Sequence, residues 1–576
     1  MNGGGHIVLS VVGPTNPGGR GTTPRPDPLI RCPLDASRRA VAQPIRAMAS
    51  RRTVSVVRTS ALLFSMVLIV VTIASPAEAT GPHRRSTVAP SASSRAPSTS
   101  GPNAAGRPAN LSSSGESDWP AYLFGTTHSS DNSSATAITT ANASSLNAVW
   151  NYVPTGSEPL GNVIWSSPTV YDGQVYIGSD NGTFYDLNET TGAVVWSHFT
   201  KQQQRASCEG GFGQGFVSTA TVAISPKTGR ATVYVAAPSG YLDAWDASNG
   251  RRVWRSVIAL PSKKVNNYFD WSSPTVANGK IYVGVASNCS DPLVRGGEKV
   301  YDQATGHLLA TFSTVPPHDV GGGIWSSALV TNDGSVYVTT GNPSFSGQPP
   351  GYSESIIRLD PQTLQVDDHW TIPSNQQVWD GDFGASATVW TADLPTGPTQ
   401  MVGAVDKNGN FYALNASDLA AGPVWVDNLG YSFPFAECIS AGVWDPATGQ
   451  LFLSGPEITV NGTTYNGSVE EVDPATGATI WQTALPAAVT GTPTLDGAGV
   501  LAVPTMSWAS GESGAVYLLN ASNGQILATV NTDGTSVFSQ PVFAESYLFV
   551  ATEGEGIMAF EPSPSTNSAQ KSRGGR

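Results

Sequence analysis

Residues 165–196 read WSSPTVYDGQVYIGSDNGTFYDLNETTGAVVW, and this stretch decides the fold. Short apolar segments alternate in it with polar turns, one of them of the Asn-x-x-x-Gly type. This alternation predicts four short antiparallel strands joined by tight turns. Related stretches begin at Trp271 (WSSPTVANGKIYVG), Trp325 (WSSALVTNDGSVYVTTG) and Gly491 (GTPTLDGAGVLAVP), so the unit is an internal repeat.

One position near the end of each unit counts the repeats. It is occupied in turn by Trp150, Trp196, Trp254, Phe312, Trp370, Trp425, Trp481 and Val530. Eight units of four strands predict an all-β, eight-bladed β-propeller of four-stranded antiparallel blades over residues 115–562. We expect the recurring aromatic ring to pack between neighbouring blades, where it covers a large apolar area.

The last unit, residues 536–562, supplies only three strands. The missing outer strand is available near the start of the repeats, in SLNAVWNYV at residues 145–153. Pairing of these two segments would close the ring and remove a free sheet edge.

Composition and charge exclude some classes of function. The chain has 576 residues, of which only 13% are charged, with 61 Gly, 42 Pro and 15 Trp, as is typical of strands, tight turns and aromatic packing. A net charge of −13 argues against a nucleic-acid partner, because such binding depends on neutralising phosphates. No His-Glu-x-x-His, Walker or Gly-x-Ser-x-Gly motif is present in the sequence.

The chain before the repeats is predicted to direct export. Residues 1–79 form an N-terminal extension and a signal peptide with a probable start at Met48, an apolar run too short to span a bilayer, and cleavage after Ala79. An uncleaved anchor is the alternative. We expect residues 80–114, rich in Ser, Pro and Ala, and residues 563–576 to be a disordered linker and tail. The location would then be extracytoplasmic, secreted or at the surface of a bacterium.

Cysteine usage leaves one question open. Export permits a disulfide among Cys208, Cys289 and Cys438, and the sequence does not choose the pair. No Cys-x-x-Cys-His motif occurs, so no c-type haem is built into the chain.

The repeats and their lead-in resemble the PQQ-binding propellers, namely quinoprotein alcohol dehydrogenases and relatives such as polyvinyl-alcohol dehydrogenases. The resemblance covers roughly residues 117–562. Four stretches carry it most specifically: GVASNCSDPLVRGGEKVYDQATGHLLATFSTVP (284–316), GGGIWSSALVTNDGSVYVTTGNP (321–343), VWDGDFGASATVWTADL (378–394) and GAVDKNGNFYALNASD (403–418).

The resemblance implies a metal site and a stacking platform. Asp291, four residues before Arg295, falls where the family has a calcium-ligating glutamate, and Asn342 falls where an amide oxygen meets the metal. Asp382 would be a further metal contact, and Trp325 falls where a tryptophan lies flat against the quinone. Calcium prefers such oxygen ligands.

The resemblance also implies the catalytic groups. Asp382 or Asp380 would be the general base that accepts the proton of the alcohol. Alignment from residues 392–394 favours Asp382, whereas the preceding Trp379 favours Asp380. If Asp380 is the base, Asp382 stands where lanthanide-using relatives carry an extra carboxylate, although calcium remains the first choice. Lys407 would contact the quinone carbonyls and stabilise negative charge on the reduced ring.

Each of these residues has an ordinary structural alternative. Asp291, Asn342 and Lys407 are also typical of turns, and the two aspartates of solvated loops. Trp325 shares its repeat position with other tryptophans and could serve core packing alone. The sequence also departs from the family in lacking an adjacent Cys-Cys pair and in having Asp for the metal-ligating Glu.

The sequence therefore predicts a secreted PQQ-dependent alcohol dehydrogenase-like quinoprotein with calcium. It would oxidise a small-molecule or polymeric alcohol by hydride transfer and pass electrons to a separate acceptor such as a cytochrome c. The alternative is a non-catalytic propeller that binds protein or polysaccharide outside the cell, because a fold does not determine a function.

Overall fold

The computed structural model describes residues 117–155, 162–200, 203–204, 213–260, 268–287, 293–344, 351–430, 438–507 and 512–563. The predicted signal peptide, the linker and nearly all of the predicted tail lie outside these residues, as do Asp291, Cys208 and Cys289.

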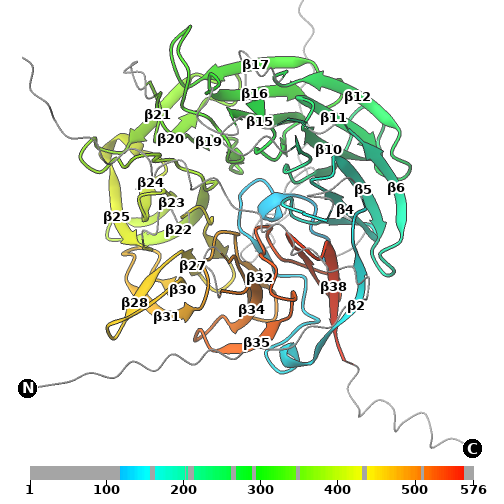
Figure 1. Ribbon diagram of the computed structural model, residues 1–576. Helices are drawn as coiled ribbons and strands as arrows, with labels where there is room; N and C mark the ends of the chain where they lie inside the picture. The colour runs from blue at the N-terminus through cyan, green and yellow to red at the C-terminus, as the bar shows by residue number, and fades with distance from the viewer. Residues whose placement is uncertain are drawn as a thin grey trace, which may run out of the picture.

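Eight antiparallel sheets are arranged as blades around a central axis, with the chain running once around the ring (Figure 1). Blades 1 to 4 consist of β3 (Thr169–Tyr171), β4 (Gln174–Gly178), β5 (Thr183–Asn188) and β6 (Val194–Phe199); β9 (Thr221–Ile224), β10 (Ala231–Ala237), β11 (Tyr241–Asp246) and β12 (Arg252–Val257); β14 (Thr275–Ala277), β15 (Lys280–Ser287), β16 (Gly297–Asp302) and β17 (Leu308–Ser313); and β18 (Leu329–Val330), β19 (Val336–Thr339), β20 (Ser355–Leu359) and β21 (Val366–Thr371).

Blades 5 to 8 complete the ring. They consist of β22 (Thr388–Leu394), β23 (Gly397–Val405), β24 (Asn410–Asn415) and β25 (Pro423–Asn428); β26 (Val443–Asp445), β27 (Gln450–Gly455), β30 (Gly467–Val472) and β31 (Thr479–Leu485); β32 (Thr494–Asp496), β33 (Val500–Thr505), β34 (Ala515–Asn520) and β35 (Ile526–Val530); and β36 (Val542–Ala544), β37 (Tyr547–Ala551), β38 (Ile557–Pro562) and β2 (Leu146–Tyr152).

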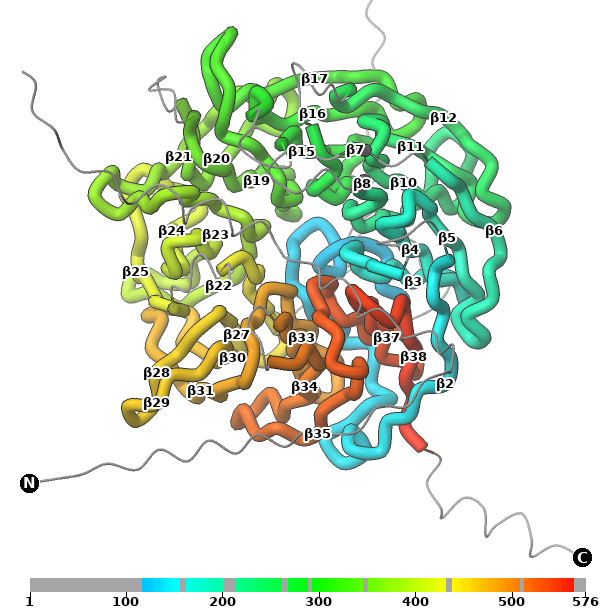
Figure 2. Tube along the Cα trace, in the orientation of Figure 1, coloured from blue at the N-terminus to red at the C-terminus, as the bar shows by residue number. Residues whose placement is uncertain are grey.

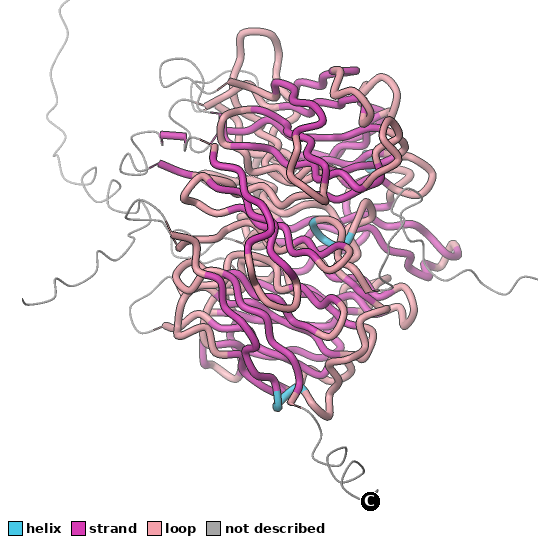
Figure 3. The backbone as a smooth tube through the Cα atoms, turned by 90° about the vertical axis from the view of Figure 1, so that its right-hand side faces the viewer, coloured by secondary structure: helices cyan, strands magenta, loops and turns pink. Residues whose placement is uncertain are grey.

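The remaining elements are short. They are β1 (Asp131–Asn132), which pairs in parallel with β32, β13 (Tyr268–Phe269), the pair β7 (Gln203–Gln204) and β8 (Gly213–Gln214), the hairpin β28 (Ile458–Val460) and β29 (Thr463–Tyr465), and the 3-10 turns η2 (Tyr122–Phe124), η3 (Ala143–Ser145) and η5 (Leu419–Ala421). Seen at 90° to the first view, strands dominate and helical turns are few (Figure 3).

The ring closes as the sequence predicts. Strand β2 pairs antiparallel with β38, from Leu146 opposite Pro562 to Tyr152 opposite Ile557. The outer strand of blade 8 therefore comes from the beginning of the propeller, so that the first and last segments of the domain hold each other in place (Figure 1).

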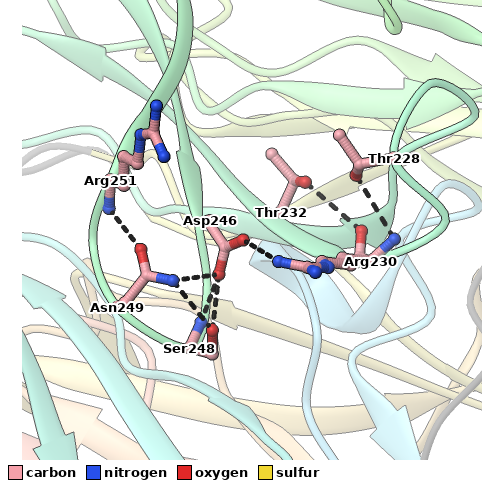
Figure 4. A network of polar contacts seen from close by, with 7 residues as sticks. All are labelled: Thr228, Arg230, Thr232, Asp246, Ser248, Asn249 and Arg251. Carbon is pink, nitrogen blue, oxygen red and sulfur yellow. Dashed lines mark hydrogen bonds and ion pairs between the residues drawn. The ribbon is translucent and has the colours of Figure 1, made fainter.

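The Asp/Asn-x-x-x-Gly turns connect the third and fourth strands of most blades. In blade 2 the Asp246 carboxylate accepts hydrogen bonds from the Ser248 N–H (3.1 Å) and Oγ (2.6 Å), and from Asn249 Nδ2 (3.1 Å) (Figure 4). Asn249 Oδ1 in turn accepts the Arg251 N–H at 2.9 Å. The acidic or amide side chain thus satisfies backbone donors that the turn would otherwise leave free.

The recurring tryptophans pack between blades, which confirms the prediction. Trp196 of blade 1 donates from Nε1 to the Ala247 carbonyl of blade 2 at 2.9 Å. A Cβ on Gly250, which ends the same turn, would come within 2.7 Å of the Trp196 ring. Only glycine leaves room for the ring there. The same contact with the tryptophan of the preceding blade recurs at Gly192, Gly306, Gly477 and Gly524.

A belt of hydroxyl groups joins the blades around the hub. In each link a backbone N–H of one blade donates to the side-chain oxygen of the next. The links are Ser167 to Thr219 (2.9 Å), Thr219 to Ser273 (3.0 Å), Ser273 to Ser327 (3.0 Å), Ser327 to Ser386 (2.8 Å), Ala441 to Thr492 (3.0 Å) and Gln540 to Ser167 (2.9 Å). The small polar residues after each hub position therefore satisfy buried backbone donors that have no strand partner.

The lead-in segment crosses the hub rather than running along the rim (Figure 2). Its carbonyls accept backbone hydrogen bonds from blades 2, 4, 6 and 7: Val222 N–H to Pro120 (2.8 Å), Val330 N–H to Thr126 (2.7 Å), Trp444 N–H to Ser129 (2.9 Å) and Leu495 N–H to Ser130 (3.0 Å). Tyr122 of this segment lines the hub cavity. Backbone hydrogen bonds thus tie the lead-in to four blades around the hub.

Candidate functional site

The hub holds an aromatic cavity of about 70 Å³. Trp165, Trp271, Trp325 and Phe538 line it. The Trp165 and Trp271 rings are parallel within 5° with centroids 6.2 Å apart, and Trp271 meets Trp325 edge-on at 5.8 Å. Three tryptophans that share one repeat position therefore meet at the axis, although the sequence alone predicted a ligand role only for Trp325.

Blade 5 makes room for Trp325. At the repeat position where blades 1 and 3 carry Trp165 and Trp271, blade 5 has Gly384. A Cβ on Gly384 would overlap the Trp325 ring, which lies directly over this glycine. Glycine is therefore required at this position for the ring to adopt its observed place.

Hydrogen bonds bring three polar residues of blades 4 and 5 together beside Trp325 of the hub cavity. Asn342 follows β19, Asp382 precedes β22 and Lys407 follows β23. The Asn342 N–H donates to Asp382 Oδ1 at 2.6 Å, and the Lys407 N–H donates to the Asp382 carbonyl at 2.9 Å. Asp382 therefore fixes the positions of both neighbours through its side chain and its backbone.

Lys407 connects the charged groups to the aromatic platform. Its Nζ lies 3.1 Å from Asp382 Oδ2 and 3.3 Å from Asp380 Oδ2, and 5.2 Å from the centroid of the Trp325 ring. The Lys407 and Asp382 side chains are 8% and 7% exposed, against 24% for Asp380. Because Lys407 meets both aspartates, the structure brings together the two residues between which the sequence left the general base open.

Two further carboxyl groups surround Asp382, and sequence analysis missed both. Glu354, 3% exposed, lies beside Gly381, where an added Cβ would be 2.8 Å from Glu354 Oε1. Burial, and then the nearby Asp406 and Asp382, raise the pKa of Glu354 to about 8. Burial raises the pKa of Asp406 to about 7. Glu354 lies in the stretch SES (353–355), just before an apolar strand, and no motif in that stretch marks it as a site residue.

The other predicted site residues have separate outcomes. Asp291 lies outside the described residues, so its role as a metal ligand stays a prediction. Cys438 is buried and free in the described part of the chain, while Cys208 and Cys289 lie outside it. Within the described ranges, no helix is long and apolar enough to cross a membrane.

The donor set can be compared with what a quinone and a metal ion require. A planar anionic ring needs a flat face and a cation, which Trp325 and Lys407 supply together. A hard cation needs oxygen donors, and Asn342 and Asp382 supply an amide and a carboxylate. Asn342 Nδ2 is buried and has no hydrogen-bond partner among the described residues, so this amide is not committed to a structural contact.

Two observations limit this fit. Among the residues that the structure describes, no group of three or more His, Cys, Asp or Glu could hold a metal ion by itself. The hub cavity of about 70 Å³ is also smaller than the roughly 300–1,000 Å³ of typical small-molecule sites. The residue types therefore fit the cofactor, whereas space for it would have to arise on the side of Trp325 that Lys407 covers.

Comparison with curated proteins finds quinoprotein relatives. The chain is 24% identical over 315 residues to quinohemoprotein alcohol dehydrogenase ADH-IIG of Pseudomonas putida, covering 48% of this chain and 41% of the relative. It is 24% identical over 340 residues to polyvinylalcohol dehydrogenase of Sphingopyxis sp., covering 51% of this chain and 48% of the relative. The chain thus spans less than half the length of these relatives.

Solved structures show the same fold at lower identity. The quinohemoprotein alcohol dehydrogenase of Comamonas testosteroni matches with a TM-score of 0.61 at 18% identity, over 77% of this chain and 80% of the other. The ADHIIG structure from Pseudomonas putida matches with a TM-score of 0.63 at 17% identity, over 79% and 84%.

Two family models match the chain, each over a separate stretch of the ring. Residues 465–565 match the model described as outer membrane protein assembly factor BamB. Residues 119–426, more than half of the chain and including Trp325, Asn342, Asp382 and Lys407, match the glucose/ethanol/alcohol dehydrogenase β-propeller domain. The chain therefore belongs to the quinoprotein family of PQQ-type β-propellers.

Proposed function

We propose that the protein is an extracytoplasmic, PQQ-dependent alcohol dehydrogenase whose site lies beside Trp325 at the hub, between blades 4 and 5. The observation that carries the proposal is the meeting of Trp325, Asp382 and Lys407 at one place, from three separate segments of blades 4 and 5. Together with Asn342, they supply a flat face, a carboxylate, an amide and a cation.

Each residue would have a defined task. Trp325 would bind one face of the quinone and exclude water from it. Asn342 and Asp382 would hold the metal ion, with Asp291 as a further ligand. Calcium is our first choice, and a lanthanide the second. When bound, the quinone would accept the hydride of the alcohol, and the metal ion would polarise the accepting carbonyl.

Asp382 would act as the general base. Its Oδ1 accepts the Asn342 N–H and its Oδ2 pairs with Lys407, so the carboxylate is held in place by both neighbours. In this position it would take the hydroxyl proton of the alcohol. Asp380, more exposed and also paired with Lys407, is the second candidate for this role. Glu354, with a pKa of about 8, would be largely protonated at neutral pH and would not compete as a base.

Lys407 would change partners when the cofactor binds. Its Nζ covers the Trp325 face at 5.2 Å, the position that a stacked ring needs. We expect the ammonium group to move to the edge of the ring, where it would stabilise charge on the carbonyl oxygens. The cofactor would thereby create the space that the hub cavity lacks.

The substrate would be a small or polymeric alcohol, and electrons would leave to a separate acceptor such as a cytochrome c. A second candidate function is a non-catalytic extracellular scaffold that binds protein or polysaccharide. The small hub cavity and the pairing of both aspartates with Lys407 favour it, because a closed polar network needs no ligand.

Dye-linked alcohol oxidation separates the two candidates. The full chain would be incubated with PQQ and either calcium or lanthanum chloride, and then assayed with a panel of primary and secondary alcohols. The enzyme hypothesis predicts turnover that requires both PQQ and the metal ion and that Asp382→Asn abolishes. Absence of turnover with every alcohol, combined with no thermal shift by PQQ, would leave the scaffold as the function.

A further inference from the structure

A second pocket, of about 340 Å³, lies at the seam where the ring closes. We call it the seam pocket. It is lined by Asp118, Asp172, Gly173, Glu189, Thr190, Glu545 and Tyr547. These residues come from the lead-in, from two turns of blade 1 and from one turn of blade 8, and none belongs to the hub site.

Backbone contacts bring the acidic residues together. Trp119 of the lead-in exchanges two backbone hydrogen bonds with Val170 of β3, each 2.9 Å long. This places Asp118 beside the next turn, where its Oδ1 accepts the Asp172 N–H at 3.2 Å. On the other side the Glu545 N–H donates to the Ser117 carbonyl at 3.3 Å. The lead-in is thus held between blade 1 and blade 8.

The seam pocket carries four carboxyl groups, and no basic side chain of the described chain lines it. Asp118 and Glu189 are 4% and 5% exposed. Glu189 Oε1 is buried and accepts no hydrogen bond from any residue that the structure describes. Burial of a hydrogen-bond acceptor without a donor costs free energy. A cation that donates a hydrogen bond to Glu189 would therefore be bound favourably in this pocket.

The lining indicates which kind of cation fits. In the described ranges no set of three or more acidic, His or Cys side chains has a metal-holding arrangement. The volume of about 340 Å³ is about ten times the share of one water molecule in the liquid, roughly 30 Å³. An ammonium or guanidinium group offers several N–H donors to separate carboxylates, and the half-buried Tyr547 offers an aromatic face.

We infer that the seam pocket binds an organic cation, an alkylammonium or guanidinium group, through Glu189, Asp118, Asp172 and Glu545. The group belongs either to a free polyamine or to a lysine or arginine side chain of a partner protein. A bound cation joins the lead-in to blades 1 and 8, so it stabilises ring closure as well.

Ionisation of Glu189 tunes this binding. Burial, followed by the charges of Glu545 and Asp118, raises the pKa of Glu189 to about 7. Asp172 and Tyr547 are the other titratable groups that line the pocket, and no cation of the described chain opposes them. If only ionised Glu189 binds, the affinity rises about tenfold between pH 6 and pH 8.

Isothermal titration calorimetry on the full chain tests the inference. Spermidine and a short arginine-containing peptide are titrated separately, with calcium chloride as a third arm. We expect a dissociation constant below about 1 mM for at least one organic cation. Binding of spermidine alone identifies a polyamine site, and preference for the peptide identifies a protein partner; either supports the inference.

Matched variants locate the binding. Glu189→Gln is expected to weaken it about tenfold or more, because it removes the buried charge at constant size. Glu545→Gln, at an exposed position in the same pocket, gives a second variant should Glu189→Gln fold poorly. Asp393→Asn makes the same charge change at an exposed position on β22 and should bind as the wild type does.

Three results would overturn the inference. These are the absence of heat with both organic cations, equal affinity of Glu189→Gln, Glu545→Gln and the wild type, or calcium binding that spermidine does not displace. Since neither PQQ nor an alcohol enters the experiment, its outcome is independent of the proposed enzymatic function.

Discussion

The equivalent turns of blade 1 and blade 5 have the same scaffold and opposite charge. Blade 1 has Asp180-Asn181-Gly182 after β4, and blade 5 has Lys407-Asn408-Gly409 after β23. In both, the asparagine Nδ2 donates to a tyrosine hydroxyl four residues on, at 2.9 Å. The two turns thus share their geometry, whereas the residue before the asparagine differs in charge, being Asp180 in blade 1 and Lys407 in blade 5.

The carboxyl groups near the two turns differ accordingly. Asp270, beside Asp180 in blades 1 to 3, has no lysine partner among the described residues, and burial raises its pKa well above the usual range. Its Oδ2 accepts a long hydrogen bond from the Val217 N–H at 3.4 Å. Asp382 in blade 5 has the ammonium group of Lys407 at 3.1 Å. The sector around Asp270 therefore holds a carboxyl group that faces no described cation, whereas the sector around Asp382 places an ammonium group against a carboxyl group. In that second sector the neighbouring Glu354 and Asp406 also have raised pKa values, because they are buried.

The largest expected effect concerns activity. Asp382→Asn should lower the rate of dye-linked alcohol oxidation by about 10²–10⁴-fold, because the amide cannot accept the proton. Asp270→Asn removes a carboxyl group of the other sector and should leave the rate within about threefold of the wild type. Equal losses in the two variants would show that the sectors do not differ in function.

The next effect concerns stability. Lys407→Met leaves two aspartates facing each other with little solvent, and should lower the free energy of unfolding by about 3–5 kcal/mol. Arg230→Met breaks the ion pair between Arg230 and Asp246. Because the Arg230 side chain is 72% exposed, this change should lower the free energy of unfolding by about 1 kcal/mol or less. Chemical denaturation of both variants measures the difference, and similar costs would contradict the buried role of Lys407.

The dependence of stability on pH should reveal the raised pKa of Asp270. The pKa of Asp270 is raised in the folded protein, so folding favours the protonated form, and its contribution is lost as the pH rises above the unfolded value. Asp270→Asn should therefore gain stability relative to the wild type on going from pH 5 to pH 8. For one group the slope cannot exceed about 1.4 kcal/mol per pH unit. Melting curves at several pH values test this, and a parallel course of both proteins would exclude the raised pKa.

The smallest expected effect distinguishes the hub tryptophans. Trp325→Leu should weaken PQQ binding by about 2–12-fold, the range for loss of an aromatic stacking contact. Trp271→Leu, a matched change in the parallel pair with Trp165, should change the affinity by less than twofold. Fluorescence titration gives both constants. A greater loss for Trp271 would move the site to the other side of the hub.

The repeat made most of the fold predictable from sequence. The position occupied by Trp196 recurs once in each repeat and so fixes the number of blades, and in five places its ring packs against a glycine of the next blade. The segment around Trp150 was identifiable as the missing strand because a three-stranded last blade leaves an open edge. The path of the lead-in across the hub was not predictable, since the backbone hydrogen bonds that tie it to four blades do not depend on side-chain type.

The candidate site was only partly visible in the sequence. Trp325, Asp382 and Lys407 stand in stretches with a family pattern, and the fold brings them together. Glu354 and the seam carboxyl groups have no such pattern. Glu354 and Glu189 become notable only when folding removes them from water, because burial and the proximity of other carboxyl groups, not residue type, set their pKa values.

An equilibrium titration of the calcium-loaded full chain with PQQ, followed by tryptophan fluorescence, tests the central claim most directly. We expect saturable quenching at one equivalent, with weaker binding in Asp382→Asn and unchanged binding in Asp270→Asn. Absence of quenching at any PQQ concentration, or equal weakening by both substitutions, would contradict a quinone site between blades 4 and 5.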